Sequence, residues 1–173
     1  MHNLYWVFLF VMCSGLRLAS CDCEDRCPLF WTPWRDHCYK YFAEEVSYYD
    51  ALNFCRLFST EEHLRGFADL VSIHSLDEQE FVYHFWQSFR EQDNRPNRPA
   101  LWIGLTDDVN GQYEWSDRTP FNFSHFDVGQ ESTASQNLYF LYDYVSAHGK
   151  WHDISDHRDW HVKFMCKMPR IDQ

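Results

Sequence analysis

The C-terminal part of the chain concentrates the side chains that could bind a metal ion. The set comprises four histidines and three aspartates, namely His148, His152, His157, His161, Asp153, Asp156 and Asp159. Imidazole nitrogens and carboxylate oxygens are ligands that zinc takes in proteins. A four-residue spacing aligns ligands on a helix, but the pattern of this segment predicts strand, turn and strand. We therefore expect a polar, partly solvated loop surface here rather than a zinc site.

Catalysis has less support in the sequence than binding. A nucleophilic enzyme needs a nucleophile and a base that is oriented by a further group. The chain contains no serine elbow, no phosphate-binding glycine loop and no paired-histidine metal motif. We expect a binding protein rather than an enzyme.

Charge and composition restrict the partners. The chain has 173 residues, a formal net charge of −11 and no run of lysine or arginine. Nucleic acids and anionic membrane surfaces are recognised through basic faces, so we expect neither as a partner. Aromatic residues make up 19% of the chain, which favours one domain with a packed core.

Residues 1–20 have the pattern of a secretory signal peptide. The apolar run from Leu4 to Cys13 is too short to span a bilayer, and small residues follow it up to Ser20. The alternative interpretation is a buried N-terminal strand. Since no second long apolar segment follows, the sequence predicts a secreted, extracellular protein without membrane insertion.

Secretion changes what the cysteines indicate. Cys13 lies in the predicted signal peptide, and the mature chain keeps Cys21, Cys23, Cys27, Cys38, Cys55 and Cys166. In an oxidising compartment such cysteines favour disulfides over metal binding or catalysis. Their pairing does not follow from the sequence alone.

Hydrophobic spacing predicts two helices in the first half of the chain. Ser47 can cap a helix in which Tyr48 and Cys55 lie on one face. Ser75 and Glu78 have the spacing of a capping box and precede a second amphipathic helix with an aromatic stripe. The aromatic stripe is typical of a core-facing helix.

Strand patterns dominate the second half. We expect strands at 38–42, 69–73, 101–105, 112–117, 137–145, 150–154 and 162–168. Polar or proline-rich segments at 59–68, 90–100 and 117–137 are expected to be loops. Helices early in the chain and strands late favour the α+β class.

Over Cys27 to Pro169 the chain resembles the C-type lectin-like domain family. The resemblance is carried, in the family's order, by "SYYDALNFC", "LVSIHSLDEQEFV", "WIGLTD", "GQYEWSD", "WHDIS" and "FMCK". The segment "FWTPWRDHCYKYFA" is similar to the secreted single-domain lectins of marine invertebrates, of the echinoidin type. This implies two helices flanking small antiparallel sheets, with a long irregular binding loop. The implied organisation is a signal peptide at 1–20, a cysteine-containing tail at 21–26 and a lectin-like domain at 27–169.

The resemblance also implies how the cysteines pair. It assigns two disulfides, Cys27–Cys38 and Cys55–Cys166. Cys21 and Cys23 are left over, and a bond between such close neighbours would be strained. We therefore expect them to join chains into a disulfide-linked homo-oligomer, unless the tail is trimmed.

A disulfide that clamps the long loop in the family is missing from this chain. Leu138 and Asp156 stand where its cysteines would be. The loop is expected to be less constrained, unless packing of Leu138, Tyr139 and Phe140 replaces the bond. Core packing is the expected role of the tryptophans Trp102, Trp115 and Trp151.

The family's principal calcium site maps onto residues that suit calcium poorly. Its positions hold Gln130, Glu131, Ser132, Gln136, His152 and Asp153. Asp153 is the one carboxylate clearly in register, and His152 brings a nitrogen where calcium prefers oxygen. The family's accessory site maps onto Asp107, Asn110, Thr133 and Asn137. We expect a degenerate site: calcium is possible, through a register shift that recruits Glu131, but binding is weak.

The implied function is carbohydrate recognition with little or no dependence on calcium, and the expected partner is a glycan or glycoprotein. Four aromatic side chains could stack on sugar rings, namely Phe126, Tyr142, Tyr144 and Trp151, beside the polar positions just given. The alternative is a calcium-independent protein-binding or extracellular-matrix module. Asn122 in "NFS" is a glycosylation sequon, so we also expect a glycoprotein with a glycan near the binding face.

Overall fold

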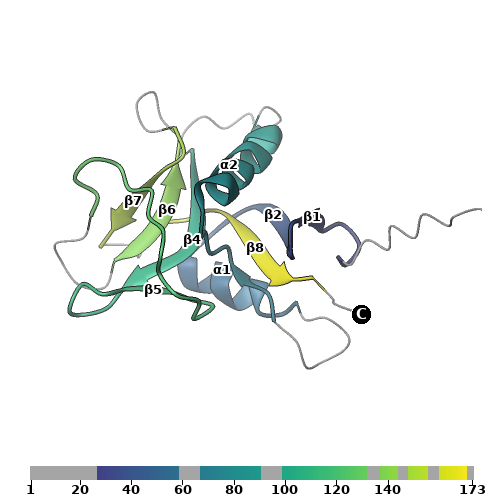
Figure 1. The fold of residues 1–173 in the computed structure, drawn as a ribbon, viewed down its shortest axis with the longest axis horizontal. Coiled ribbons are helices and arrows are strands. Elements are labelled where there is room, and N and C mark those ends of the chain that lie inside the picture. The colour runs from purple at the N-terminus through teal and green to yellow at the C-terminus, as the bar shows by residue number, and fades with distance from the viewer. Residues whose placement is uncertain are drawn as a thin grey trace, which may run out of the picture.

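A computed structural model describes residues 27–58, 67–90, 99–131, 137–143, 148–155 and 160–170. Within these ranges the chain forms two helices and eight strands (Figure 1). The helices are α1 (Tyr48–Cys55) and α2 (Leu76–Arg90). The strands are β1 (Thr32–Trp34), β2 (His37–Val46), β3 (Asp69–Leu70), β4 (Ala100–Asp107), β5 (Tyr113–Trp115), β6 (Leu138–Tyr142), β7 (Lys150–Ile154) and β8 (Val162–Pro169). No helix in the described part combines the length and apolar character needed to cross a bilayer.

Both helices begin at the predicted caps. The backbone N–H of Asp50 donates to Ser47 Oγ at 3.2 Å, which starts α1. At α2 the N–H of Glu78 donates to Ser75 Oγ, also at 3.2 Å. The carboxylate of Glu78 instead accepts from the N–H of His74 at 2.8 Å. Glu78 thus does not complete the capping box by accepting from the N–H of Ser75, because its side chain faces the interior of the domain.

The strands form one mixed sheet in the order β1-β2-β8-β4-β6-β7, with β3 beside β8 and β5 beside β4. All pairs are antiparallel except β4 with β8, which run parallel. This parallel pair joins the small antiparallel sheets expected from the sequence into a single sheet. The first long strand, β2, lies beside the last, β8, so the two ends of the domain meet as the resemblance implied.

The sheet is buried on both faces. Alternate residues of β4 point to opposite sides: Trp102 lies in one core cluster and Leu101 in the other. Helix α1 covers the face of Trp102, and α2 covers the opposite face with Trp86. The continuous apolar run "LWIGL" follows from burial on both faces. The predicted core role of Trp102, Trp115 and Trp151 is confirmed, since each is fully buried.

Gly104 occupies the point where β4 comes closest to its neighbours. A Cβ atom at this position would lie 2.6 Å from Ser116 Oγ and 2.9 Å from the carbonyl oxygen of Leu70. This carbonyl oxygen belongs to β3 and cannot move away without displacing that strand, so no side chain fits at position 104.

The two expected disulfides are present. Cys27–Cys38 closes a hairpin with a sequence separation of 11 residues, and Cys55–Cys166 spans 111 residues. The second bond joins the last turn of α1 to β8 and so ties the two halves of the chain together.

Aromatic packing anchors the long loop, which lacks the family's clamp disulfide. Leu138, Tyr139 and Phe140 are buried, as the packing alternative required. Phe121 and Phe126 of the loop also pack on Tyr113, with ring centroids 4.8 Å and 5.0 Å away. The described part of the loop is therefore anchored by side chains on β5 and β6.

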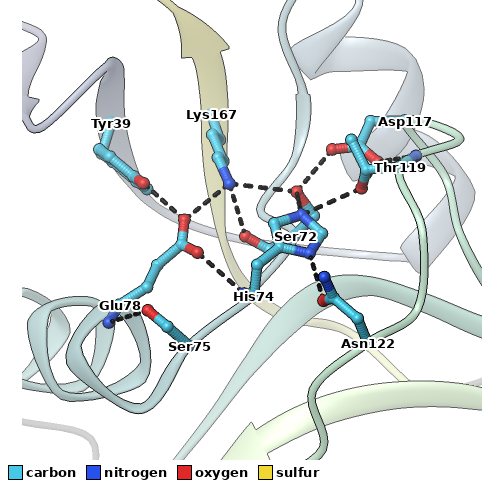
Figure 2. Close-up of polar contacts among 9 residues, drawn as sticks. All are labelled: Tyr39, Ser72, His74, Ser75, Glu78, Asp117, Thr119, Asn122 and Lys167. Atoms are coloured by element: carbon cyan, nitrogen blue, oxygen red, sulfur yellow. Dashed lines mark hydrogen bonds and ion pairs between the residues drawn. The ribbon is translucent and has the colours of Figure 1, made fainter.

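A buried polar network links β2, β8 and α2 (Figure 2). Lys167 Nζ lies 2.6 Å from Glu78 Oε1 and donates to the carbonyl oxygen of Ser72 at 3.0 Å. The hydroxyl of Tyr39 donates to the same Glu78 oxygen at 2.6 Å. Because the side chains of Lys167 and Glu78 are only 5% and 6% exposed, each charge depends on the other for compensation.

Candidate functional site

The candidate site lies where the long loop meets the edge strand β7. Phe126 and Trp151 form a parallel bridge between the two segments. The N–H of Trp151 donates to the carbonyl oxygen of His125 at 3.0 Å. The N–H of Asp127 donates to the carbonyl oxygen of Trp151 at 3.1 Å. These bonds prolong the sheet beyond β7 and place the residues after Asp127 beside the middle of that strand. We call this region the loop–β7 junction, residues 125–131 and 150–154.

Gln130 and Asp153 are in contact at the loop–β7 junction. The N–H of Asp153 donates to Gln130 Oε1 at 3.3 Å. Burial raises the pKa of the Asp153 carboxyl above its ordinary value, and the charge of Asp107 acts in the same direction. Glu131, the next residue in the loop, is exposed. The junction therefore offers amide and carboxylate groups, which suit the hydroxyl groups of a sugar.

His152 is held by protein groups. Its Nε2 lies 3.2 Å from Asp127 Oδ2, and its ring lies 4.9 Å from the ring of Tyr142 and 6.0 Å from that of Phe140. Burial lowers the pKa of His152, although the neighbouring Asp127 carboxylate opposes this shift. The lowered pKa favours the neutral imidazole at pH 7, and Nε2 lies close to Asp127 without the alignment of a hydrogen bond.

The expectation that Trp151 stacks on a sugar ring is wrong. Its side chain is fully buried, and its Nε1 donates to Gln79 Oε1 of α2 at 2.7 Å. Phe126 is half-buried and packs edge-on against Trp151, at 5.5 Å. The ring of Tyr142 lies against His152, and Tyr144 lies outside the described residues. Core packing thus takes Trp151 out of the four possible stacking residues.

Asp107, from the accessory calcium position, is used to hold β6. Its carboxylate accepts a short hydrogen bond from the N–H of Asn137 and a bond of 3.3 Å from the hydroxyl of Tyr139. Asn110 lies in a turn, where its N–H donates to Asp108 Oδ1 at 2.8 Å. Thr133 lies outside the described residues. Asp107 and Asn110 therefore both serve the protein's own hydrogen bonding.

The described donors at the loop–β7 junction fit calcium poorly. Calcium takes about six to eight oxygen ligands, whereas Gln130 and Asp153 are accompanied here by an imidazole. Within the described ranges, no group of three or more His, Cys, Asp or Glu side chains is arranged to hold a metal ion. Other expected donors lie outside those ranges, namely Ser132, Gln136, Asp156, His157 and Asp159.

A family comparison identifies the domain. The family described as "Lectin C-type domain" matches residues 44–168. The chain belongs to the C-type lectin family. The C-type lectin CEL-I from Cucumaria echinata has the same fold, with a TM-score of 0.69 and 29% identity over 84% of this chain and 99% of that one.

Two curated relatives of this lectin domain are echinoderm lectins. Echinoidin of Heliocidaris crassispina is 35% identical over 101 residues, which are 57% of this chain and 67% of echinoidin. The alpha-N-acetylgalactosamine-specific lectin of Patiria pectinifera is 28% identical over 167 residues, 92% of this chain and 93% of that lectin. The family resemblance inferred from the motifs is confirmed.

Asp127 is the residue of this lectin site that sequence spacing missed. Its carboxylate contacts His152, and its carbonyl oxygen accepts from the N–H of Gln130 at 3.1 Å. The signal was the turn sequence "DVGQ", in which Gly129 has a φ of 79°. Asp127 thus shapes the turn that presents Gln130 and, at the same time, lies beside His152.

Two further expectations concern covalent chemistry. Asn122 is exposed, and its Oδ1 lies 3.4 Å from His74 Nδ1 (Figure 2). Cys21 and Cys23 lie outside the described residues, so the homo-oligomer stays a prediction.

Proposed function

We propose that this chain is a secreted lectin that binds carbohydrate at the loop–β7 junction without needing calcium. The observation that carries the proposal is the pair of contacts across the junction. Asp153 bonds to Gln130 at 3.3 Å, and His152 lies 3.2 Å from Asp127. In these contacts the protein supplies the organisation that an ion gives in a calcium-dependent site. Family membership supports sugar as the ligand class.

N-acetylgalactosamine is the first sugar to test. The relative that spans nearly the whole chain is named as specific for alpha-N-acetylgalactosamine. The acetamido group and hydroxyls of this sugar would match the amide of Gln130 and the carboxylates of Asp153 and Glu131. Stacking on Trp151 is not part of this proposal, because that ring is buried.

The test is calorimetry with methyl N-acetyl-α-galactosaminide, first with millimolar calcium and then with chelator. We expect dissociation constants that agree within about twofold. Asp153→Ala should weaken binding about tenfold or more, since hydrogen bonds to a charged group contribute about 1.5–3 kcal/mol. Glu44→Ala, an exposed change on β2, serves as the control and should leave binding unchanged.

Two results would contradict the proposal in different ways. Binding that disappears with chelator would mean that an ion completes the site. A rise in the unfolding midpoint on addition of calcium would show that the folded protein binds the ion, because a ligand at 100 times its dissociation constant stabilises by about 2.7 kcal/mol. Absence of binding to any sugar on a glycan array would favour the alternative, a protein-binding or matrix module.

We also propose that Asn122 carries an N-linked glycan in the secreted protein. Its side chain is exposed, and its contact with His74 uses the amide oxygen rather than the nitrogen that receives the sugar. Mass spectrometry before and after treatment with peptide N-glycosidase should show the loss of a glycan mass. Asn122→Gln should abolish this difference. Equal masses for the treated and untreated wild-type protein would refute occupancy.

A further inference from the structure

We propose that the domain has a second ligand site, for a sugar ring that carries a sulfate ester or a carboxylate. The site is a cavity of about 610 Å³ between the end of β8 and the start of the long loop, which we call the β8 cavity. Cavities of about 300–1,000 Å³ are typical of small-molecule sites. Its wall includes His37, Arg56, Phe67, Asp69, Asp117, Arg118 and Lys167.

The β8 cavity is separate from the loop–β7 junction. It lies beside β2, β3 and β8, whereas β7 is the strand at the far end of the sheet order. The two sites share no residue, so the proposal does not depend on sugar binding at the junction.

Protein donors already satisfy both carboxylates in the wall. Asp69 accepts from Arg56 Nε at 2.9 Å, from the N–H of Leu70 at 2.8 Å and from the hydroxyl of Ser116. These contacts neutralise Asp69 within the fold and leave it little capacity to oppose an incoming anion.

The second carboxylate accepts hydrogen bonds from neutral donors, which hold it in place. Asp117 accepts from the hydroxyl of Ser72 at 2.5 Å and from the N–H of Thr119 at 2.9 Å (Figure 2). The hydroxyl of Thr119 also donates to it, at 2.5 Å. Asp69 is thus compensated by Arg56, whereas Asp117 is fixed by hydrogen bonds and keeps its negative charge.

Arg118 is the cation that the cavity leaves available. Lys167 is paired with Glu78, and Arg56 contacts Asp69 and the carbonyl oxygen of Ser116. Arg118 is exposed, and no carboxylate of the described residues forms an ion pair with it. An exposed guanidinium beside a cavity is well suited to bind a sulfate or carboxylate through two parallel hydrogen bonds.

The backbone of Arg118 holds its guanidinium beside the cavity in an uncommon conformation. Its φ of 64° lies in the left-handed region, where a side chain is unfavourable and glycine is preferred. Strained residues of this kind cluster at ligand-binding sites, because the surrounding fold holds them in place. Here the turn after β5 is fixed by a bond from the N–H of Arg118 to the carbonyl oxygen of Trp115, at 2.9 Å.

An aromatic ring on the same cavity indicates the rest of the ligand. Phe67 is 72% exposed although it is a large apolar side chain, and it lines the β8 cavity with Met168 and Pro169. Aromatic faces bind the apolar side of sugar rings, while the guanidinium binds an acidic substituent. A sulfated or carboxylated hexose combines these two features in one molecule.

The experiment is calorimetry at low ionic strength with glucose 6-sulfate, glucuronate and glucose. We expect at least one acidic sugar to bind at least tenfold more tightly than glucose, and the sulfate and carboxylate arms identify which acid is preferred. Arg118→Gly should remove this preference without lowering the unfolding midpoint, because glycine suits the left-handed backbone. Phe67→Ala should weaken binding of the preferred acidic sugar severalfold.

Arg35→Gly is the matched control. Arg35 also has a positive φ, of 48°, but its exposed guanidinium pairs with Asp77 and does not line the β8 cavity. The control removes the same charge and should keep the preference for the acidic sugar, as should Asp153→Ala at the loop–β7 junction. Equal affinity of the wild type for glucose and both acidic sugars would overturn the proposal. An equal loss in Arg118→Gly and Arg35→Gly would also overturn it, by showing only an effect of net charge.

Discussion

Replacing Lys167 with methionine is expected to lower the free energy of unfolding by about 3–5 kcal/mol. The change leaves the carboxylate of Glu78 buried without the ammonium group that lies 2.6 Å away in the native protein. Removal of one partner from a buried pair is costly, because the remaining charge keeps its desolvation penalty and loses its compensation. Urea unfolding at pH 7 measures the effect.

A double variant separates the charge effect from lost packing. Lys167→Met combined with Glu78→Gln has no buried charge, and the amide oxygen can still accept from Tyr39 or His74. We expect the double variant to recover about half or more of the lost stability, as coupled residues do not contribute additively. A double variant as unstable as the sum of both single changes would contradict this account.

The exposed pair Arg35–Asp77 provides a surface control. Its side chains are 57% and 66% exposed, so water screens the attraction. Arg35→Met should therefore cost no more than about 1 kcal/mol.

The pH dependence of unfolding tests the same pair. Burial by itself raises the pKa of Glu78, but Lys167 and the hydrogen bonds from Tyr39 and His74 outweigh it and lower the pKa. A carboxylate whose folded pKa is lowered stabilises the protein above its unfolded pKa, about 4.3. This stabilisation is lost as the pH falls through the lower, folded pKa. In Lys167→Met, protonation relieves the unpaired charge, so the stability difference from the wild type should narrow on acidification.

Removing the disulfide Cys55–Cys166 is expected to lower the free energy of unfolding by roughly 4–5 kcal/mol. The bond spans 111 residues, and in the chain-entropy model its main effect is to restrict the unfolded chain. The double change Cys55→Ala and Cys166→Ala isolates this effect, because it leaves no free thiol at either position. Denaturant unfolding under non-reducing conditions gives the difference in free energy.

The second disulfide is a matched control within the same chain. Cys27–Cys38 spans only 11 residues, and the same model gives about 3 kcal/mol for its removal as alanines. The order of the two effects is the sharper expectation, since strain and residual structure change absolute values. A larger loss from the Cys27–Cys38 change would show that local packing, rather than loop length, sets the contribution of these bonds.

Local signals in the sequence determined much of the fold. Ser47 and Ser75 marked the helix starts, because a cap needs only a side-chain oxygen near the next N–H groups. Alternation predicted β7 at its observed bounds, Lys150–Ile154. Both disulfides came from the family resemblance rather than from spacing, and the structure forms both.

Contacts between distant segments were decided only by the tertiary structure. The parallel pairing of β4 with β8 has no local pattern, since residues 108–161 separate the two strands. For Trp151 the sequence favoured core packing and left stacking on a sugar as an option, and its bond to Gln79 on α2 shows that it belongs to the core. Likewise, nothing in "DVGQ" or "WHD" alone shows that Asp127 faces His152.

The two candidate sites illustrate the same division. The residue types at 130–131 and 152–153 predict a poor calcium site, because ligand chemistry follows from side-chain identity, and this stays a prediction. The β8 cavity gave no sequence signal, since its residues come from the start, the middle and the end of the domain and meet only in the folded chain. The local sequence thus determines which chemical groups are present. Packing between distant segments determines that Asp69, Asp117 and Lys167 contact other protein groups and that Arg118 is exposed beside the cavity.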